Sequence, residues 1–340
     1  MMKIKLKRFK VIMVNPIDQK WVSELQTLLA DLHDIGEVIS TYCTEEKKFI
    51  EEVQGCDVII PVGGESRSFL NKKTLLKLKK LKAIITSGVG YDSIDIEMAG
   101  KLGISVANTI NFCRFEVAEH ALALIFSAAR QITLFDRVIR SEYKVNLREA
   151  AKKIYRLKGK VAGIIGFGRI GQSLSTRLIG CGFQVIAYDY YYDNIKEACK
   201  KMKVASVGLH DLLKKSDVIS IHVPFTEKTY HMIGENELNM MKKSATLINT
   251  SRGEIIDERA LFKALKKEKI AFAGLDVFEK EPLSPDNPLT KLNNVILTPH
   301  LASTSIESEE ERLSEIASNI RRFFTGEELK NIVNYDSFLK

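Results

Sequence analysis

Three side chains of different chemistry, Arg252, Glu281 and His300, stand near strand-like segments in the second half of this 340-residue chain. A guanidinium can bind a carboxylate and polarise a neighbouring carbonyl, and an imidazole exchanges protons near neutral pH. A carboxylate beside the imidazole would fix its orientation and favour its protonated form. Together they predict a site that binds a 2-keto acid and protonates the alkoxide formed when hydride reaches the carbonyl carbon.

Each of these residues has a simpler explanation when it is taken singly. Arg252 alone is best explained by a surface ion pair, and His300 alone by a capping or core role. However, Arg252 and His300 each follow an apolar run. The crevice outside the carboxyl ends of parallel strands is where open α/β sheets bind ligands. This shared setting favours the catalytic interpretation.

A glycine-rich sequence, Gly166 to Gly171, follows the apolar run 161–165 and precedes a helical pattern at 170–180. Such a loop permits a tight turn, lets the backbone approach a pyrophosphate, and allows the helix to pack closely on the strand. N–H groups at the start of the helix would bind the phosphates. By itself the motif is equally well explained by an ordinary glycine-rich turn. The residues predicted to contact a dinucleotide here are Gly166, Gly168, Arg169, Ile170 and Gly171.

The type of dinucleotide is predicted by the end of the next strand-like run, at Asp189. A carboxylate there accepts hydrogen bonds from the adenosine ribose and repels a 2′-phosphate. Tyr190 to Tyr192 follow without Lys or Arg, so we expect NAD rather than NADP. Asp276, at the end of a later strand, could bind the nicotinamide amide, or it could cap a turn.

Composition limits the class of protein. Hydrophobic residues make up 45% and charged residues 28%, as in soluble globular proteins. No apolar run approaches the roughly 20 residues needed to cross a bilayer. Five cysteines without a C-x-x-C pair argue against a disulfide framework, and we expect a cytoplasmic protein with no metal. The net charge of +8 raises the possibility of nucleic-acid binding. Because Lys72 to Lys82 is interpreted as the solvated face of a helix, we expect small anionic substrates instead.

The chain alternates strand-like and helical patterns in two series, which predicts two parallel-sheet domains. The expected strands are 11–14, 57–60, 83–85, 104–106, 161–165, 184–188, 218–222, 245–249, 271–276 and 295–297. One long helix is expected at 115–139, and a last helix at about 306–324 is expected to return to the first domain. The predicted fold is two doubly wound α/β domains. A Rossmann NAD-binding domain (110–300) is inserted into a flavodoxin-like substrate-binding domain (1–109 and 301–340).

At these residues the chain resembles the D-isomer-specific 2-hydroxyacid dehydrogenase family. That family includes D-lactate dehydrogenases, phosphoglycerate dehydrogenase, and glyoxylate and hydroxypyruvate reductases. The matching segments include Gly88-Val89-Gly90-Tyr91-Asp92, Val106-Ala107-Asn108-Thr109, Glu116-Val117-Ala118-Glu119-His120, Leu157-Lys158-Gly159-Lys160, His222-Val223-Pro224 and Asn249 to Gly253.

The resemblance implies an NAD-dependent oxidoreductase of EC class 1.1.1 that forms a homodimer, with D-3-phosphoglycerate among the candidate substrates. It implies that Arg252 binds the substrate, that Glu281 and His300 are the acid/base pair, and that Asp276 orients the nicotinamide. It also implies cofactor contacts from His222, Pro224 and Thr250. Backbone N–H groups of Val89 and Gly90 would hold the substrate carboxylate.

Two segments depart from the family pattern. The family commonly has Pro-Gly after Asn-Thr, where this chain has Ile110 to Arg114. The segment Gly63 to Arg67 is also unusual, and Arg67 could either contact a phosphate or face solvent.

Three other functions fit the same architecture to different degrees. Formate dehydrogenase carries an amide in place of the acidic partner, so Glu281 argues against it. Phosphonate (phosphite) dehydrogenase retains the Glu and His, and only an assay separates it. An NAD-sensing corepressor-like binding protein would need a peptide groove, for which the sequence gives no signal.

Overall fold

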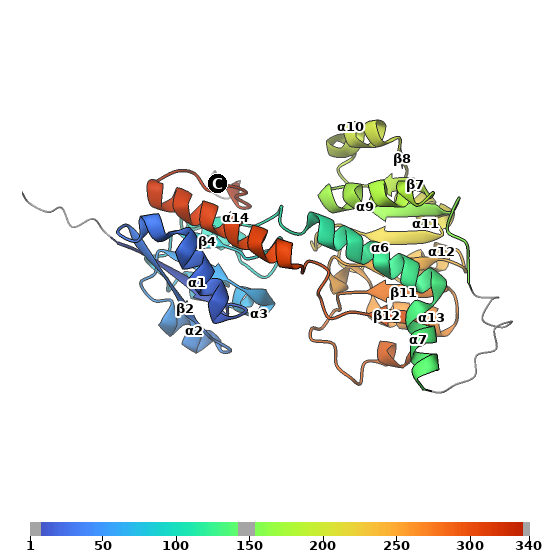
Figure 1. Cartoon of the computed structure of the whole chain (residues 1–340), viewed down its shortest axis with the longest axis horizontal. Helices are drawn as coiled ribbons and strands as arrows, with labels where there is room; N and C mark the ends of the chain where they lie inside the picture. Colours follow the sequence, from blue (N-terminus) through green and yellow to red (C-terminus); the bar gives the residue numbers. More distant parts are fainter. Residues whose placement is uncertain (1–7, 142–153, 336–340) are drawn as a thin grey trace, which may run out of the picture. The chain divides into compact units, whose positions relative to one another are not determined.

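The computed structural model describes residues 8–141 and 154–335, which form two compact units (Figure 1). Unit 1 comprises residues up to Phe112 and those from Ser305 onward, and unit 2 runs from Cys113 to Thr304. Residues 1–7, 142–153 and 336–340 lie outside the described residues. No helix in the described ranges is long and apolar enough to span a membrane.

Unit 1 is built on a parallel sheet of five described strands in the order β2-β1-β3-β4-β5. This is the order of a flavodoxin-like domain. The strands are β1 (Phe9–Val14), β2 (Gly36–Thr41), β3 (Val58–Pro61), β4 (Ala83–Ile85) and β5 (Ser105–Ala107). The helices are α1 (Gln19–Leu28), α2 (Glu46–Glu52), α3 (Gly63–Ser68), α4 (Lys72–Leu75), α5 (Ile96–Lys101) and α14 (Ile306–Thr325), with a short 3-10 turn at Ala30–Leu32.

Alternate residues of β1, β3, β4 and β5 enter two different cores. Val11 and Met13 pack with side chains of α1 and α14, whereas Ile12 and Val14 pack on the other face with side chains of α2, α4 and α5. Successive strand side chains point to opposite faces, so a strand that is apolar throughout must be covered on both sides. The continuous apolar runs of the sequence therefore specify a three-layer unit.

Unit 2 is built on a parallel sheet of seven described strands in the order β12-β11-β10-β9-β6-β7-β8. The strands are β6 (Val161–Ile165), β7 (Gln184–Tyr188), β8 (Ala205–Ser206), β9 (Val218–Ile221), β10 (Thr246–Asn249), β11 (Phe272–Leu275) and β12 (Val295–Leu297). The helices are α6 (Arg114–Arg130), α7 (Ile132–Arg140), α9 (Arg169–Gly180), α10 (Tyr192–Met202), α11 (Leu209–Lys215), α12 (Glu235–Met240) and α13 (Glu258–Lys266), with 3-10 turns at Gly253–Ile255 and Pro288–Lys291.

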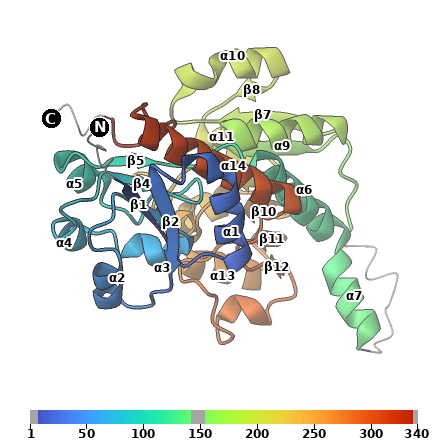
Figure 2. The ribbon, with the colours of Figure 1, turned by 60° about the vertical axis from the view of Figure 1, so that its left-hand side comes forward.

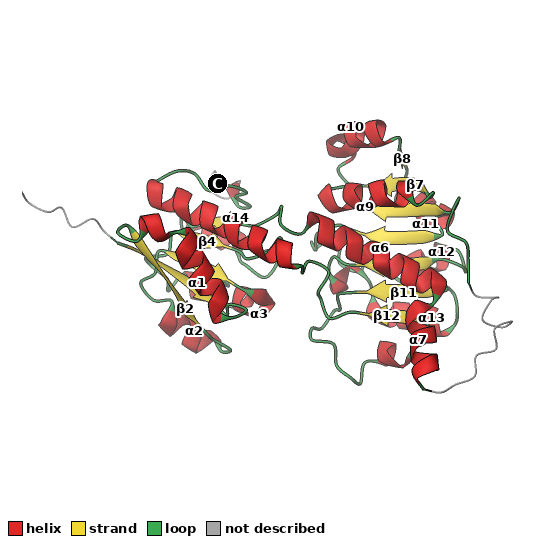
Figure 3. Cartoon of the chain, in the orientation of Figure 1, coloured by secondary structure: helices red, strands yellow, loops and turns green. Residues whose placement is uncertain are grey.

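The strand order of unit 2 is that of a Rossmann domain, and the predicted fold class is confirmed. Side chains of α6 and α9 cover one face of the sheet, and side chains of α11, α12 and α13 cover the other. Figure 3 shows these helices flanking the yellow strands. The chain runs from β6 to β7 and β8 on one side and then crosses from β8 to β9 on the other side of β6, so the strand order reverses at β6, where such sheets bind ligands at the carboxyl ends of their strands.

The structure corrects the single helix predicted at 115–139. Gln131 adopts the left-handed conformation (φ 54°), which ends α6 and separates it from α7. The apolar spacing continues through Ile132 and Ile139, but no residue of α7 is buried. The periodic pattern therefore identified helical residues correctly and missed the break.

The helix predicted at Lys72 to Lys82 is also wrong beyond its first turn, since α4 ends at Leu75. Leu75, Leu78 and Leu81 are buried and are joined by N–H to carbonyl bonds three residues apart. A spacing of three fits a succession of tight turns better than a 3.6-residue helix. The strands β2 and β8 were not predicted.

Candidate active site

The loop after β10 places Arg252 at the carboxyl end of the unit 2 sheet. The Asn249 side chain accepts from the Ser251 N–H (3.0 Å) and donates to the Arg252 carbonyl (2.8 Å), which fixes the turn. Gly253 follows, and a Cβ there would lie 1.9 Å from the carbonyl carbon of Phe278. Only glycine therefore allows the Arg252 loop to pack against the loop that follows β11. Arg252 is half-buried, and its Nη1 donates to the carbonyl of Ser251 (2.7 Å).

His300 and Glu281 form a hydrogen-bonded pair. His300 Nδ1 lies 2.6 Å from Glu281 Oε2, and the Phe278 N–H donates to Oε1 at 3.0 Å. Burial raises the pKa of the Glu281 carboxyl, but the hydrogen bond and charge of His300, the Phe278 N–H and the charge of Arg252 outweigh it. The pKa therefore lies below its ordinary value. Because Glu281 engages Nδ1, Nε2 is the ring nitrogen that can exchange a proton with a substrate.

Asp276 holds the turn that carries His300. Its carboxylate is fully buried and accepts hydrogen bonds from Thr298 Oγ1 (2.5 Å) and from the N–H groups of Leu301 (3.0 Å) and Ala302 (2.8 Å). His120 of α6 bonds the same threonine hydroxyl (2.9 Å). The turn-capping role considered for Asp276 is thus present, and its contact with nicotinamide stays a prediction. Thr298 was missed by the sequence analysis, which could not show that its hydroxyl points inward.

The three predicted catalytic residues gather at one edge of one sheet. Arg252 follows β10, Glu281 lies in the loop after β11, and His300 follows β12, and these strands are neighbours. The charge of Arg252 acts on the Glu281 carboxyl, so the two groups interact. A cation for a carboxylate and an imidazole for proton transfer are therefore brought together.

The glycine loop has the shape that a dinucleotide requires. A Cβ on Gly166 (φ +92°) would lie 2.5 Å from the His222 carbonyl oxygen, and one on Gly171 would lie 2.2 Å from the Gly166 carbonyl oxygen. In contrast, no atom lies within 4 Å of a Cβ built on Gly168. Two glycines are thus required by tight packing, and the third leaves open space where a pyrophosphate could approach the backbone.

Asp189 connects the glycine loop to the end of β7. Its carboxylate accepts from the N–H groups of Phe167 (2.8 Å) and Tyr191 (3.0 Å). These bonds hold the negative charge beside the loop, where the ribose of a dinucleotide is predicted to bind. Arg169 begins α9 and Ile170 follows it, as the motif requires.

Two buried polar atoms near these strand ends lack a partner among the described residues. They are Thr250 Oγ1 and His222 Nδ1, both in residues predicted to contact the cofactor. His222 Nε2 is bonded to the Ser220 hydroxyl (2.8 Å), and burial lowers the pKa of this imidazole to about 3. The ring is therefore neutral at physiological pH. Because unpaired buried polar atoms are costly, these two fit the polar contacts of a bound cofactor. Pro224, nearby, accepts a hydrogen bond from Thr229 Oγ1 through its carbonyl (2.7 Å).

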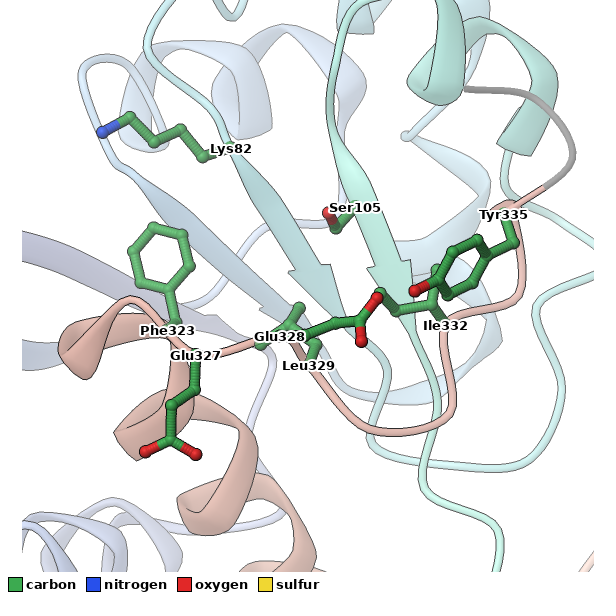
Figure 4. A pocket seen from close by; sticks show the side chains of 8 residues that line it. All are labelled: Lys82, Ser105, Phe323, Glu327, Glu328, Leu329, Ile332 and Tyr335. Atoms are coloured by element: carbon green, nitrogen blue, oxygen red, sulfur yellow. The ribbon is translucent and has the colours of Figure 1, made fainter. Parts of the chain in front are cut away.

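The remaining predicted positions, Val89 and Gly90, lie in unit 1, in the turn after β4. Unit 1 also contains a hollow of about 370 Å³ beside β4, β5 and the segment after α14 (Figure 4). None of the residues that line it is a predicted site residue.

No cluster of three metal-ligating side chains occurs in the ranges 8–141 and 154–335.

Comparison with known proteins gives the family. A family model described as D-isomer specific 2-hydroxyacid dehydrogenase, NAD binding domain, matches residues 122–302. The glyoxylate reductase of Korarchaeum cryptofilum is 41% identical over 294 residues, which cover 86% of each chain. This chain belongs to the D-isomer-specific 2-hydroxyacid dehydrogenase family.

The dehydrogenase is thus an NAD-binding oxidoreductase that transfers hydride between a 2-hydroxy acid and a 2-keto acid. A solved D-lactate dehydrogenase from Aquifex aeolicus, complexed with NAD and lactic acid, superposes with a TM-score of 0.82 at 31% identity and covers 95% of this chain and 99% of that one. The D-3-phosphoglycerate dehydrogenase of Methanocaldococcus jannaschii is 37% identical over 96% of this chain, which spans 59% of that longer protein.

Proposed function

We propose that this dehydrogenase reduces glyoxylate, or another small 2-keto acid, with NADH. The observation that carries the proposal is the gathering of Arg252, Glu281 and His300 at the ends of three neighbouring strands. Glyoxylate is favoured because the Korarchaeum cryptofilum reductase matches over most of both chains. D-3-phosphoglycerate is the second candidate, since a relative of that name matches 96% of this chain but is much longer.

Each residue has one task in the proposed reaction. Arg252 binds the substrate carboxylate and polarises the adjacent carbonyl. Bound NADH supplies the hydride. His300 donates the Nε2 proton to the developing alkoxide, and Glu281 stabilises the imidazolium before that transfer. We also propose that the backbone N–H groups of Val89 and Gly90 bind the substrate carboxylate.

NAD is proposed over NADP because of Asp189. The two backbone N–H groups that hold its carboxylate keep a negative charge at the predicted ribose position. A 2′-phosphate placed there would be repelled. The geometry of the glycine loop and the unpaired buried atoms of Thr250 and His222 support further cofactor contacts. We propose these from Gly166, Gly168, Arg169, Ile170, Gly171, His222, Pro224, Thr250 and Asp276.

A homodimer is proposed from α7, which extends from unit 2 in Figure 2. None of its residues is buried, and Ile132 and Ile139 are 56% and 67% exposed. A second copy would remove these apolar side chains from water. A cytoplasmic location is proposed because all five cysteines are free thiols, as a reducing compartment favours.

The test is NADH oxidation with glyoxylate, hydroxypyruvate, pyruvate and 3-phosphohydroxypyruvate, repeated with NADPH. We expect the highest kcat/KM with glyoxylate or hydroxypyruvate and a preference for NADH. Phosphite oxidation, measured with NAD, tests the phosphonate dehydrogenase alternative. The proposal fails if wild type turns over none of the four keto acids faster than the His300→Ala variant does.

A further inference from the structure

The turn Gly88-Val89-Gly90 of unit 1 has all three of its carbonyl groups held by side chains. Thr86 Oγ1 donates to the Gly88 carbonyl (2.6 Å), and Asn108 Nδ2 donates to the Val89 carbonyl (2.8 Å). Arg67 Nη1 donates to the Gly90 carbonyl at 2.9 Å. The three donors come from the ends of different elements, so the turn is fixed from three directions.

The backbone N–H groups of this turn remain available as hydrogen-bond donors. No described residue accepts a hydrogen bond from the backbone N–H groups of Gly88, Val89 or Gly90. Val89 is 40% exposed. Successive N–H groups that share one direction form an anion-binding concavity. Each peptide plane joins the carbonyl of one residue to the N–H of the next, so the Thr86 and Asn108 bonds orient the N–H groups of Val89 and Gly90, and the Arg67 bond fixes the peptide that follows Gly90.

Arg67 differs from the other two donors because it carries a charge. It belongs to α3, after β3, and is half-buried. Its guanidinium lies against the turn, since a Cβ built on Gly88 would be 3.4 Å from Arg67 Nη1. A fixed positive charge beside unpaired N–H groups increases their attraction for a carboxylate. The contact with Gly90 shows that the Arg67 side chain is not purely solvated.

We propose that Arg67 is a positioning residue for the substrate carboxylate: it holds the Gly90 end of the 88–90 turn, whose N–H groups would bind the anion, and it adds positive charge there. The inference rests on the proposed function and deepens it. In this proposal Arg67 supports the binding of the carboxylate group that all 2-keto acids have in common. Replacing Arg67 should therefore lower the affinity for every 2-keto acid to a similar degree. It should affect substrate binding more than the rate of proton or hydride transfer.

The experiment compares Arg67→Ala and Arg67→Lys with the full-length wild type. The first measurement is the Kd of oxamate for the NADH complex, by calorimetry, because it does not depend on turnover. We expect Arg67→Ala to raise this Kd about tenfold or more, and Arg67→Lys, which retains a charge and a donor, to recover most of the affinity. The KM values for glyoxylate, hydroxypyruvate and 3-phosphohydroxypyruvate should rise in parallel, with kcat changed less than about threefold.

Two controls separate this role from a loss of folding. The Kd for NADH and the thermal unfolding temperature should stay close to wild type in both variants. Arg8→Ala removes another guanidinium of unit 1, one that is paired with Glu37, and should leave the oxamate Kd unchanged.

Either of two results overturns the inference. If Arg67→Ala raises KM only for 3-phosphohydroxypyruvate, then Arg67 recognises a distal phosphate. If oxamate affinity does not change, then Arg67 has no part in carboxylate binding. Failure of the proposed function would give a different result. Wild type would then turn over none of the keto acids, regardless of its affinity for oxamate.

Discussion

Unit 2 contains two imidazole–carboxylate pairs that look alike locally. His300 Nδ1 is 2.6 Å from Glu281, and His231 Nε2 is 2.8 Å from Glu279. The side chains of the two pairs are exposed to similar extents, and both histidines adopt positive φ angles (55° and 47°). Neither the hydrogen bond nor the unusual backbone conformation identifies the catalytic pair.

The surroundings of the two pairs are different. The His300 pair lies at the carboxyl ends of β11 and β12, within the influence of Arg252, and its turn is held by the buried Asp276. The carboxylate of Glu279, in contrast, accepts a second hydrogen bond from the N–H of Glu258 at the start of α13 (3.1 Å). The ring of Tyr230 stacks on that of His231, with 4.0 Å between the ring centroids. The first pair is arranged around a cation that can bind a substrate, and the second connects a loop to a helix. Position at the sheet edge is therefore our reason for proposing the His300 pair, rather than the His231 pair, as catalytic.

The largest expected effect comes from removing each imidazole. His300→Ala should lower kcat/KM for keto-acid reduction about 10²- to 10⁴-fold, because the general acid is lost. His231→Ala should change it less than about threefold. Steady-state NADH oxidation checks both variants, and equal losses would show that the comparison is wrong.

Arg252→Ala should cost about 3 kcal/mol in kcat/KM, mostly as a higher KM, because the substrate carboxylate loses its cation. Arg259→Ala is the matched control, since this exposed arginine lies on α13 near the second pair. Saturation curves with glyoxylate provide the measurement. If the KM of Arg252→Ala equals that of wild type, then Arg252 does not bind the substrate carboxylate.

Replacing each carboxylate by an amide should have a smaller effect that depends on pH. Glu281→Gln removes the negative charge that favours the protonated imidazole, so the alkaline limb of the kcat/KM profile should move to lower pH, with a loss of about tenfold near neutrality. Glu279→Gln should leave the profile in place. Values of kcat/KM measured between pH 5 and pH 9 would distinguish the two variants. If the alkaline limb moves in both, then the two carboxylates do not differ in role.

The smallest expected effect is on stability. Because the folded state lowers the pKa of Glu281, its ionised form stabilises the protein above the usual glutamate range, and this contribution is lost as the pH falls through the lowered pKa. Glu281→Gln should therefore be less stable than wild type at pH 7, by no more than about 1 kcal/mol for so exposed a pair, with the difference shrinking in acid. Urea unfolding at pH 7 and pH 4 measures it. A difference that grows as the pH falls would contradict the assigned direction.

Most of the fold was predictable because the apolar runs are short, continuous and bounded by polar turns. Residues 83–85, 161–165, 184–188 and 295–297 are strands with the predicted limits. The strand at Gly36–Thr41 was missed because its residues are mixed in polarity and only partly buried. The break at Gln131 was missed because the helical spacing of apolar residues continues past it.

The candidate site was predictable for a similar reason. Arg252 and His300 were found because each follows a strand, and the glycine loop because its spacing is specific. The contacts that support the turns were not predicted. Thr298 bonds Asp276 and Arg67 bonds the Gly90 carbonyl, and these partners lie 22 and 23 residues away in sequence. No local pattern records a contact of that kind.

The sequence by itself determined the parallel-sheet architecture, the dinucleotide loop and the kinds of side chain available for catalysis. Runs of apolar residues can be buried only as covered strands, and glycines at fixed spacing allow backbone approaches that a Cβ would block. Only the tertiary structure decided that Thr298 and His120 meet at Asp276 beneath the His300 turn, and that Arg67 holds the 88–90 turn. Those choices depend on which strand ends and loops meet in space, and that meeting is fixed by the packing of the whole sheet.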